Sequence, residues 1–181
     1  MTEADYRVSF RPLSLDDMPN MSKWLSDPEV AAWYGEGGTS VEHLTAKYSS
    51  RIAGEEPTRG FISQIDGIDV GYIQTYPIDG YPKYAAQLKI ESGAVGIDIF
   101  VGDAAYRGRG FGTAILRAFT QEIVFAEMDG VVALIGPEPG NARAIRSYEK
   151  TGFVFLKTVH VIDEENPHDS GDEFLMVRYP D

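Results

Sequence analysis

The 181-residue chain contains no cysteine, which excludes disulfides, thiolate-bound metals and a cysteine nucleophile. Its three histidines, His43, His160 and His168, are too scattered along the sequence to form a zinc motif. We therefore expect no bound metal.

Long apolar segments are missing as well. No apolar run reaches the roughly 18 residues that a membrane span needs, and Met1–Val8 lacks the basic-then-apolar pattern of a secretory leader. These absences predict a protein with no membrane partner and a cytoplasmic location. A length of 181 residues with 43% hydrophobic residues suits one globular domain over residues 1–181.

Basic residues are scarce, since 16 Lys and Arg stand against 28 Asp and Glu, giving a net charge of −12. This balance argues against nucleic acid as a partner, because its phosphates require a basic surface. The excess of acid either keeps the protein soluble or attracts a cationic ligand. The most acidic segment, Asp163–Glu173, has six acids and no Lys or Arg, and its Pro and Gly predict a loop.

The first half of the chain has signals for one strand, three helices and a hairpin. The expected elements are a strand at Val8–Arg11, a helix from Ser14 to about Ser26, a short helix from Asp27-Pro28, a helix begun by Thr39 or Ser40 that carries Leu44, Tyr48 and Ile52, and a β-hairpin turning at Asp66-Gly67.

The second half alternates strands with helices. Pro77–Gly93 has no clear periodicity and predicts an irregular excursion. The elements expected after it are a buried strand at Ala94–Val101, a helix from Phe111 to about Met128, a strand at Val131–Ile135, a helix from Asn141 to Gly152, and strands at Phe153–Ile162 and Phe174–Tyr179. This order predicts a mixed α/β fold.

A glycine- and arginine-rich segment, Tyr106–Thr113, joins the Ala94–Val101 strand to the next helix. Glycines let backbone N–H groups converge, a helix N-terminus adds positive partial charge, and guanidiniums neutralise an anion, so the pattern suits a pyrophosphate. The segment lacks the Gly-Lys-Ser/Thr of a Walker loop, and Thr113 stands where a Rossmann motif has its third glycine. The alternative is a glycine-rich helix entry with solvated arginines.

Two motifs in order resemble the GCN5-related N-acetyltransferase (GNAT) superfamily. Arg107-x-x-Gly110-x-Gly112 is similar to its acyl-CoA pyrophosphate loop, and Asn141 to Phe153 is similar to its later motif. The resemblance implies acetyl-CoA as co-substrate and a GNAT fold with a mixed, mostly antiparallel twisted sheet, split near the acyl-CoA site and flanked by helices. The implied cofactor-binding residues are Ile99, Phe100, Val101, Arg107, Gly108, Arg109, Gly110, Phe111, Gly112, Thr113, Asn141 and Ala144.

A closer resemblance, to the aminoglycoside 6′-N-acetyltransferases, covers most of the chain. It rests on Trp24-Leu25, Ala32–Gly35, Val70–Tyr76, Gly96–Asp98 and Ala144–Lys150. It implies that Asp98 lies beside the reacting amine, that Tyr148 is the acid, and that Trp33 and Tyr48 line the sugar pocket. The chain departs from that family in Pro77–Gly93, in Asp163–Glu173, and at Gly136, where the resistance enzymes usually carry an acid.

The chemistry of acetyl transfer suits Asp98 and Tyr148 as catalytic residues. An amine that is protonated near pH 7 needs a carboxylate to take its proton, and the leaving thiolate needs a proton donor such as a phenol. A backbone N–H near Ile99–Val101 would polarise the thioester carbonyl. The alternatives are that Asp98 caps a turn or pairs with an arginine, and that Tyr148 is a core residue.

Carboxylates and aromatic rings suit a polycationic sugar, which carries ammonium groups and apolar ring faces. Tyr81, Tyr84 and Glu173 are available for such contacts, but the residues predicted to bind substrate are Trp33, Tyr34, Tyr48, Tyr76, Asp98, Asp163 and Asp172.

The leading hypothesis is an aminoglycoside 6′-N-acetyltransferase that works by direct transfer in a ternary complex, as a monomer or homodimer. The alternatives are a GNAT enzyme acting on another cationic amine, such as a siderophore-type lysine or a polyamine, and a catalytically silent CoA-binding module.

Overall fold

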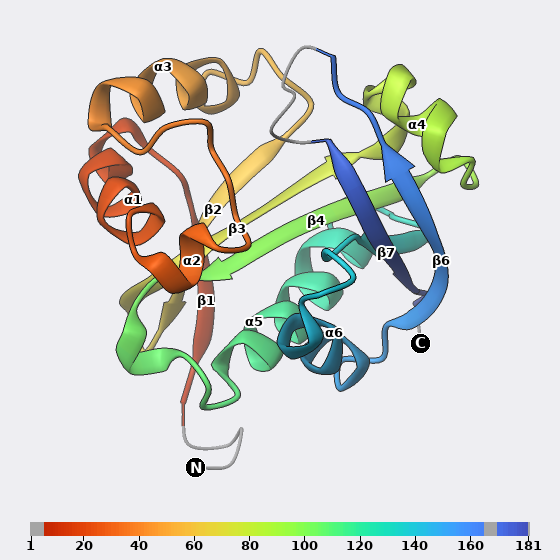
Figure 1. Cartoon of the computed structure of the whole chain (residues 1–181). Helices are drawn as coiled ribbons and strands as arrows, with labels where there is room; N and C mark the ends of the chain where they lie inside the picture. The colour runs from red at the N-terminus through yellow and green to blue at the C-terminus, as the bar shows by residue number, and fades with distance from the viewer. Residues whose placement is uncertain (1–5, 165–169, 181) are drawn as a thin grey trace. The chain divides into compact units, whose positions relative to one another are not determined.

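A computed structural model describes residues 6–164 and 170–180. Its seven strands form a sheet in the order β1-β2-β3-β4-β5-β7-β6 (Figure 1). The strands are β1 (Val8–Pro12), β2 (Arg59–Ile65), β3 (Ile68–Pro77), β4 (Ala94–Val101), β5 (Val132–Ile135), β6 (Val154–Val161) and β7 (Gly171–Arg178). The β1–β2, β5–β7 and β6–β7 pairs are antiparallel, and β4–β5 is parallel. The predicted mixed, mostly antiparallel sheet is confirmed.

The central parallel pair is short. β4 and β5 are in register only from Ala94–Val132 to Gly96–Leu134, although β4 continues to Val101. The sheet therefore opens partway along β4, as the predicted split requires. Asp98 follows this opening by two residues.

By internal contacts the chain forms two compact units. The first contains the chain up to Gln74 together with Ile99–Ile115, and the second contains Thr75–Asp98 together with the chain from Leu116 on. Strands β3 and β4 contribute residues to both units.

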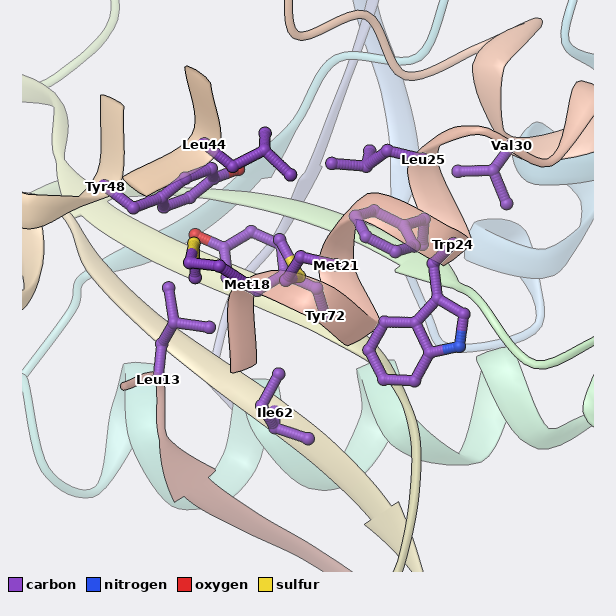
Figure 2. Packing of buried hydrophobic residues seen from close by; sticks show 11 residues of the cluster. Leu13, Met18, Met21, Trp24, Leu25, Val30, Leu44, Tyr48, Ile62 and Tyr72 are labelled. Atoms are coloured by element: carbon purple, nitrogen blue, oxygen red, sulfur yellow. The ribbon is translucent and has the colours of Figure 1, made fainter. Parts of the chain in front are cut away.

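The first unit packs its helices around an apolar cluster. These helices are η2 (Leu15–Asp17), α1 (Met18–Leu25), α2 (Pro28–Ala31) and α3 (Val41–Ile52), and α3 contacts both α1 and β2. Figure 2 shows side chains of α1 and α3 converging on Tyr72 of β3. The fully buried members include Met18, Met21, Leu44, Tyr48 and Ile62.

The predicted helix starts are confirmed by their caps. The Asp27 carboxylate accepts a hydrogen bond from the Glu29 N–H, and the Ser40 hydroxyl accepts one from the His43 N–H. A side-chain oxygen at this position satisfies a backbone donor that has no partner inside the helix. The hairpin turn is also confirmed, since Asp66 and Gly67 both have positive φ, 52° and 79°.

The second unit contains η3 (Ile78–Gly80), α4 (Pro82–Leu88) and α6 (Ala142–Glu149). The prediction of an irregular excursion at Pro77–Gly93 is wrong there, because the segment contains two short helices, η3 and α4. Pro82 stands at the start of α4, Lys89 ends it in the left-handed conformation, and Leu88 is fully buried. Burial against the core holds this short helix, which alone is too short to be stable.

After β4, η4 (Ala104–Tyr106) precedes the glycine-rich loop and α5 (Phe111–Phe119), which continues as a π-helical segment, η5 (Thr120–Phe125). The prediction of a loop for Asp163–Glu173 is wrong at the end of that segment, because Asp172 and Glu173 belong to β7. No helix among the described residues is long and apolar enough to span a membrane.

Candidate active site

Asp98 lies at the centre of a cluster of ionisable groups in the second unit. It is half-buried on β4. Burial first, and then the charge of Asp98, raise the pKa of four groups: Tyr76 on β3, Tyr84 on α4, Tyr148 on α6 and Glu173 on β7. Four elements therefore bring titratable side chains within electrostatic reach of one carboxylate. Clusters of mutually perturbed groups of this kind are typical of active sites.

Tyr148 is a neutral proton donor in this cluster. Burial, and then the charge of Asp98, raise its pKa above the ordinary value, so the phenol stays protonated at neutral pH. Its position on α6 is set by Asn141, whose side-chain oxygen accepts a hydrogen bond of 3.1 Å from the Ala144 N–H. Asn141 thus starts the helix about two turns before Tyr148.

Tyr76 packs across β4 beside Asp98. A Cβ on Gly96 would lie 2.4 Å from Cε2 of the Tyr76 ring, so the ring occupies the space that a side chain would fill. The Tyr81 ring meets Tyr76 edge-on at 5.7 Å, and the Tyr76 hydroxyl hydrogen-bonds that of Tyr84. The predicted substrate residue Tyr76 is therefore joined by two tyrosines from the segment after β3.

Replacing Gly96 with alanine is expected to displace the Tyr76 ring. The new methyl group would overlap this half-buried ring, and overpacking of this kind costs about 1–3 kcal/mol. We expect KM for a cationic acceptor to rise and KM for acetyl-CoA to stay unchanged. The matched control is Gly171→Ala, because a Cβ at Gly171 meets nothing within 4 Å. Equal acceptor KM in both variants would contradict the role given to Tyr76.

The acidic residues of β7 separate into two faces. Asp172 is exposed and pairs with His160 Nδ1 at 2.6 Å, whereas Glu173 shares the face of the buried Leu175 and Val177. The prediction that Asp172 binds substrate is not supported, because strand alternation directs its side chain away from that face. The sequence analysis gave Glu173 as an available anion but did not include it among the predicted substrate residues, although its alternation with Leu175 and Val177 was a usable signal.

Glu173 accepts a 2.9 Å hydrogen bond from the Tyr84 hydroxyl. Burial, and also the charge of Asp98, raise its pKa to about 7. The carboxyl group therefore changes charge near neutral pH. Asp163, another predicted substrate residue, is half-buried, and its N–H donates to the Ser170 hydroxyl at 2.8 Å. Most of the loop beyond Asp163 lies outside the described residues.

In the first unit, Arg107 is held by Asp27, the cap of α2. The two side chains form a bidentate pair, with Nη1–Oδ1 at 3.0 Å and Nη2–Oδ2 at 2.5 Å, and the guanidinium lowers the pKa of Asp27 to about 2. Only 11% of the Arg107 side chain is exposed. Arg107, which was predicted to bind a phosphate, is thus engaged in an ion pair with Asp27, and this pair holds the Tyr106–Thr113 loop against the start of α2.

The backbone of the same loop retains the features of an anion site. Gly108 and Gly110 have φ of 73° and 90°, which glycine adopts without strain. A Cβ at Gly110 would meet nothing within 4 Å, and α5 begins at the next residue, Phe111. A first helical turn offers N–H groups without intrahelical partners. Arg109 is exposed above the Phe111 ring, at 5.6 Å from its centroid.

The other predicted cofactor residues of this unit are mainly structural or half-buried. Phe100 is buried in the apolar cluster, 4.8 Å from the Tyr34 ring, so only its backbone is available for a ligand. Ile99 and Val101 are half-buried on either side of it. A Cβ on Gly112 would lie 3.5 Å from Cγ2 of Val101, which is ordinary van der Waals contact. Thr113 is half-buried in the first turn of α5.

The predicted sugar-pocket aromatics differ in exposure. Trp33 is 46% exposed and remains available, and Tyr34 is half-buried against Phe100. Tyr48 is 0% exposed, and its hydroxyl donates to Glu36 at 3.0 Å, while Glu36 also pairs with Lys47. The prediction that Tyr48 lines the pocket is corrected, because the ring is a core residue with no surface for a ligand.

The described residues contain no group of three side chains that could hold a metal ion. What Asp98, Tyr148 and their neighbours offer instead is acid–base chemistry: a carboxylate beside protonated phenols.

Comparison with known proteins adds a family. A family model described as "Acetyltransferase (GNAT) domain" matches residues 14–161. Aminoglycoside N(6′)-acetyltransferase type 1 of Klebsiella pneumoniae is 28% identical over 165 residues, covering 90% of this chain and 82% of the relative. A kanamycin resistance protein of Rhizobium radiobacter is 38% identical over 73 residues, which are 40% of this chain and 67% of that protein.

Solved structures give the same relationship. Aminoglycoside acetyltransferase AAC(6′)-Ib in complex with coenzyme A and kanamycin superposes with a TM-score of 0.82 at 26% identity, covering 96% of this chain and 95% of that one.

Proposed function

Because the chain belongs to the GNAT acetyltransferase family, we propose that it transfers an acetyl group from acetyl-CoA to the 6′-amine of aminoglycoside antibiotics. The relatives named above act on, or are bound to, aminoglycosides, which supports this class of acceptor. Direct transfer in a ternary complex fits a chain with no cysteine to carry the acetyl group.

The observation that carries the proposal is the proximity of Asp98 to Tyr148. A carboxylate and a phenol of raised pKa are the base and the acid that the transfer needs. A protein that only bound CoA would require neither residue.

Each residue has one role in the proposed reaction. Asp98 holds the acceptor ammonium and takes its proton, which frees the nitrogen lone pair to form the N–C bond with the acetyl carbon. The thioester of acetyl-CoA supplies the acetyl group. As the C–S bond breaks, Tyr148 gives its proton to the departing sulfur. The nitrogen, which becomes an amide, releases its second proton to solvent, and Tyr148 regains a proton from solvent. Backbone N–H groups of Ile99–Val101 polarise the carbonyl oxygen.

The loop from Gly108 to Thr113 is proposed to hold the pyrophosphate of acetyl-CoA. Positive φ at Gly108 and Gly110, the start of α5, and the exposed Arg109 support this role. Asn141 and Ala144 at the start of α6 are proposed to lie along the pantetheine arm. Arg107 is proposed to act as a brace for the loop through Asp27.

A thiol-release assay tests the function. The panel is kanamycin, a kanamycin analogue with a 6′-hydroxyl in place of the amine, spermidine and lysine, each with acetyl-CoA. We expect release with kanamycin and none with the 6′-hydroxyl analogue. Release with spermidine or lysine alone would replace the aminoglycoside with another cationic amine.

Tyr148→Phe is expected to lower kcat by about 10²-fold, because the thiolate then leaves without its proton donor. The phenyl ring keeps the packing, so CoA affinity measured by calorimetry should be unchanged. Tyr179→Phe is the control, since Tyr179 is an exposed tyrosine whose hydroxyl bonds only Glu91 among the described residues. Unchanged turnover in Tyr148→Phe would remove the residue from the mechanism.

We also propose a cytoplasmic enzyme, since its co-substrate acetyl-CoA is a cytoplasmic metabolite, acting as a monomer or homodimer. The net charge of −12 supports a cationic acceptor and opposes binding to nucleic acid.

A further inference from the structure

Glu173 is a carboxylate with which no Lys or Arg among the described residues pairs. The Tyr84 hydroxyl is its hydrogen-bond donor, at 2.9 Å. Asp98, of the same charge, is close enough to disfavour its ionisation. Burying a carboxylate near another carboxylate costs free energy unless a cation offsets it.

Gly136 makes room for this carboxylate at the end of β5. A Cβ on Gly136 would lie 2.4 Å from Glu173 Oε2 and 3.1 Å from its Cδ. The adjacent backbone fixes the position, because the Phe174 N–H donates to the Pro137 carbonyl at 2.8 Å. Glu173 thus fills the space that a side chain from residue 136 would occupy.

Tyrosine hydroxyls orient the Glu173 carboxylate. Tyr76 hydrogen-bonds Tyr84, and Tyr84 donates to Glu173, so the two phenols form a chain that ends on the carboxylate. One Glu173 oxygen takes this bond. The second carboxylate oxygen remains for a ligand.

We propose that Glu173 is a second acceptor-binding carboxylate, which together with Asp98 receives an ammonium group of the polycationic acceptor. The inference rests on the proposed function and names a residue for it. It also assigns a reason for glycine at 136, since any larger residue there would displace the Glu173 carboxylate.

This role has a pH dependence. The groups that face Glu173 are Tyr84 of α4, Tyr76 of β3 and Asp98 of β4, while β5 offers backbone at Gly136 and β6 places Val159 opposite. Because the pKa of Glu173 is about 7, the carboxyl group is protonated below this pH and loses its attraction for a cation. The kcat/KM for the acceptor should therefore fall as the pH drops through 7.

Glu173→Gln is the decisive variant, because the amide keeps an oxygen for Tyr84 and loses only the charge. With kanamycin we expect at least a tenfold rise in KM, little change in kcat and an unchanged KM for acetyl-CoA. The fall of kcat/KM for kanamycin as the pH drops through 7 should disappear. The matched control is Glu91→Gln. Glu91 also accepts from a tyrosine, Tyr179 at 3.0 Å, but it is exposed, and its variant should keep the wild-type values.

Moving the acidic side chain from position 173 to position 136 tests whether the two positions share one space. Recovery of activity in the double variant would also show that the variant folds. Gly136→Asp alone should lower the melting temperature, because its Cβ would meet the Glu173 carboxylate. In a Glu173→Ala background the same substitution should fit and recover most of the lost kcat/KM for kanamycin.

The outcomes separate the two claims. Wild-type enzyme that acetylates kanamycin, with the same KM and pH profile in Glu173→Gln, overturns the role of Glu173 and leaves the function standing. Wild-type enzyme that is silent with every aminoglycoside overturns the function, and with it this inference.

Discussion

Asp98→Asn is expected to lower kcat for aminoglycoside acetylation by about 10²–10⁴-fold, the usual contribution of a positioned general base. The amide keeps the shape of the side chain but can neither hold the ammonium by charge nor take its proton. The loss should appear in kcat and in kcat/KM, because the carboxylate acts as the amine becomes a nucleophile.

Thiol-release kinetics with kanamycin measure this effect, and calorimetry with CoA should give wild-type affinity. Asp129→Asn is the control, since Asp129 is exposed and its φ of 53° suits asparagine equally well. A kcat for Asp98→Asn within a factor of a few of wild type would exclude Asp98 as the base.

Tyr48→Ala is expected to destabilise the protein by about 3–5 kcal/mol, the range for removing a buried aromatic ring. The ring is fully buried in the cluster shown in Figure 2, packs edge-on against Tyr72 at 5.7 Å, and donates to Glu36. Its loss would leave a cavity and remove a hydrogen bond from a buried carboxylate.

Urea denaturation followed by circular dichroism tests this expectation. Trp33→Ala provides the contrast, because Trp33 is exposed and its loss should change the free energy of unfolding by less than about 0.5 kcal/mol. If Tyr48→Ala kept its stability and only raised KM for the acceptor, Tyr48 would belong to the pocket after all.

Features that depend on local sequence were predictable. Side-chain caps such as Asp27, Ser40 and Asn141 mark helix starts by satisfying backbone donors close in the chain. The Asp66-Gly67 turn needs two residues with positive φ, and these residue types supply them. The buried strand at Ala94–Val101 followed from its continuous apolar run.

Features that depend on contacts between residues distant in the sequence were not predictable. The α4 helix has no apolar periodicity of its own, and burial of Leu88 in the second-unit core holds it. Arg107 looks like a free phosphate ligand until the fold brings Asp27 to it. Tyr48 has the spacing of a helix face, and only packing decides whether that face meets the core or a ligand.

The choice between Asp172 and Glu173 shows the same limit. Position 136, at the end of β5, is glycine. The structure places the Glu173 carboxylate against Gly136, so a residue from another strand occupies the space. The local sequence shows a glycine at position 136 but does not show that the Glu173 carboxylate of another strand lies against it.

The position of the acetyl group on the product is the next thing to establish. Kanamycin incubated with the enzyme and acetyl-CoA should give a single monoacetylated product by mass spectrometry, with NMR shifts that change at the 6′-carbon and its attached protons. Acetylation at any other amine, or unmodified kanamycin from an enzyme that still binds acetyl-CoA, would contradict the assignment of a 6′-N-acetyltransferase.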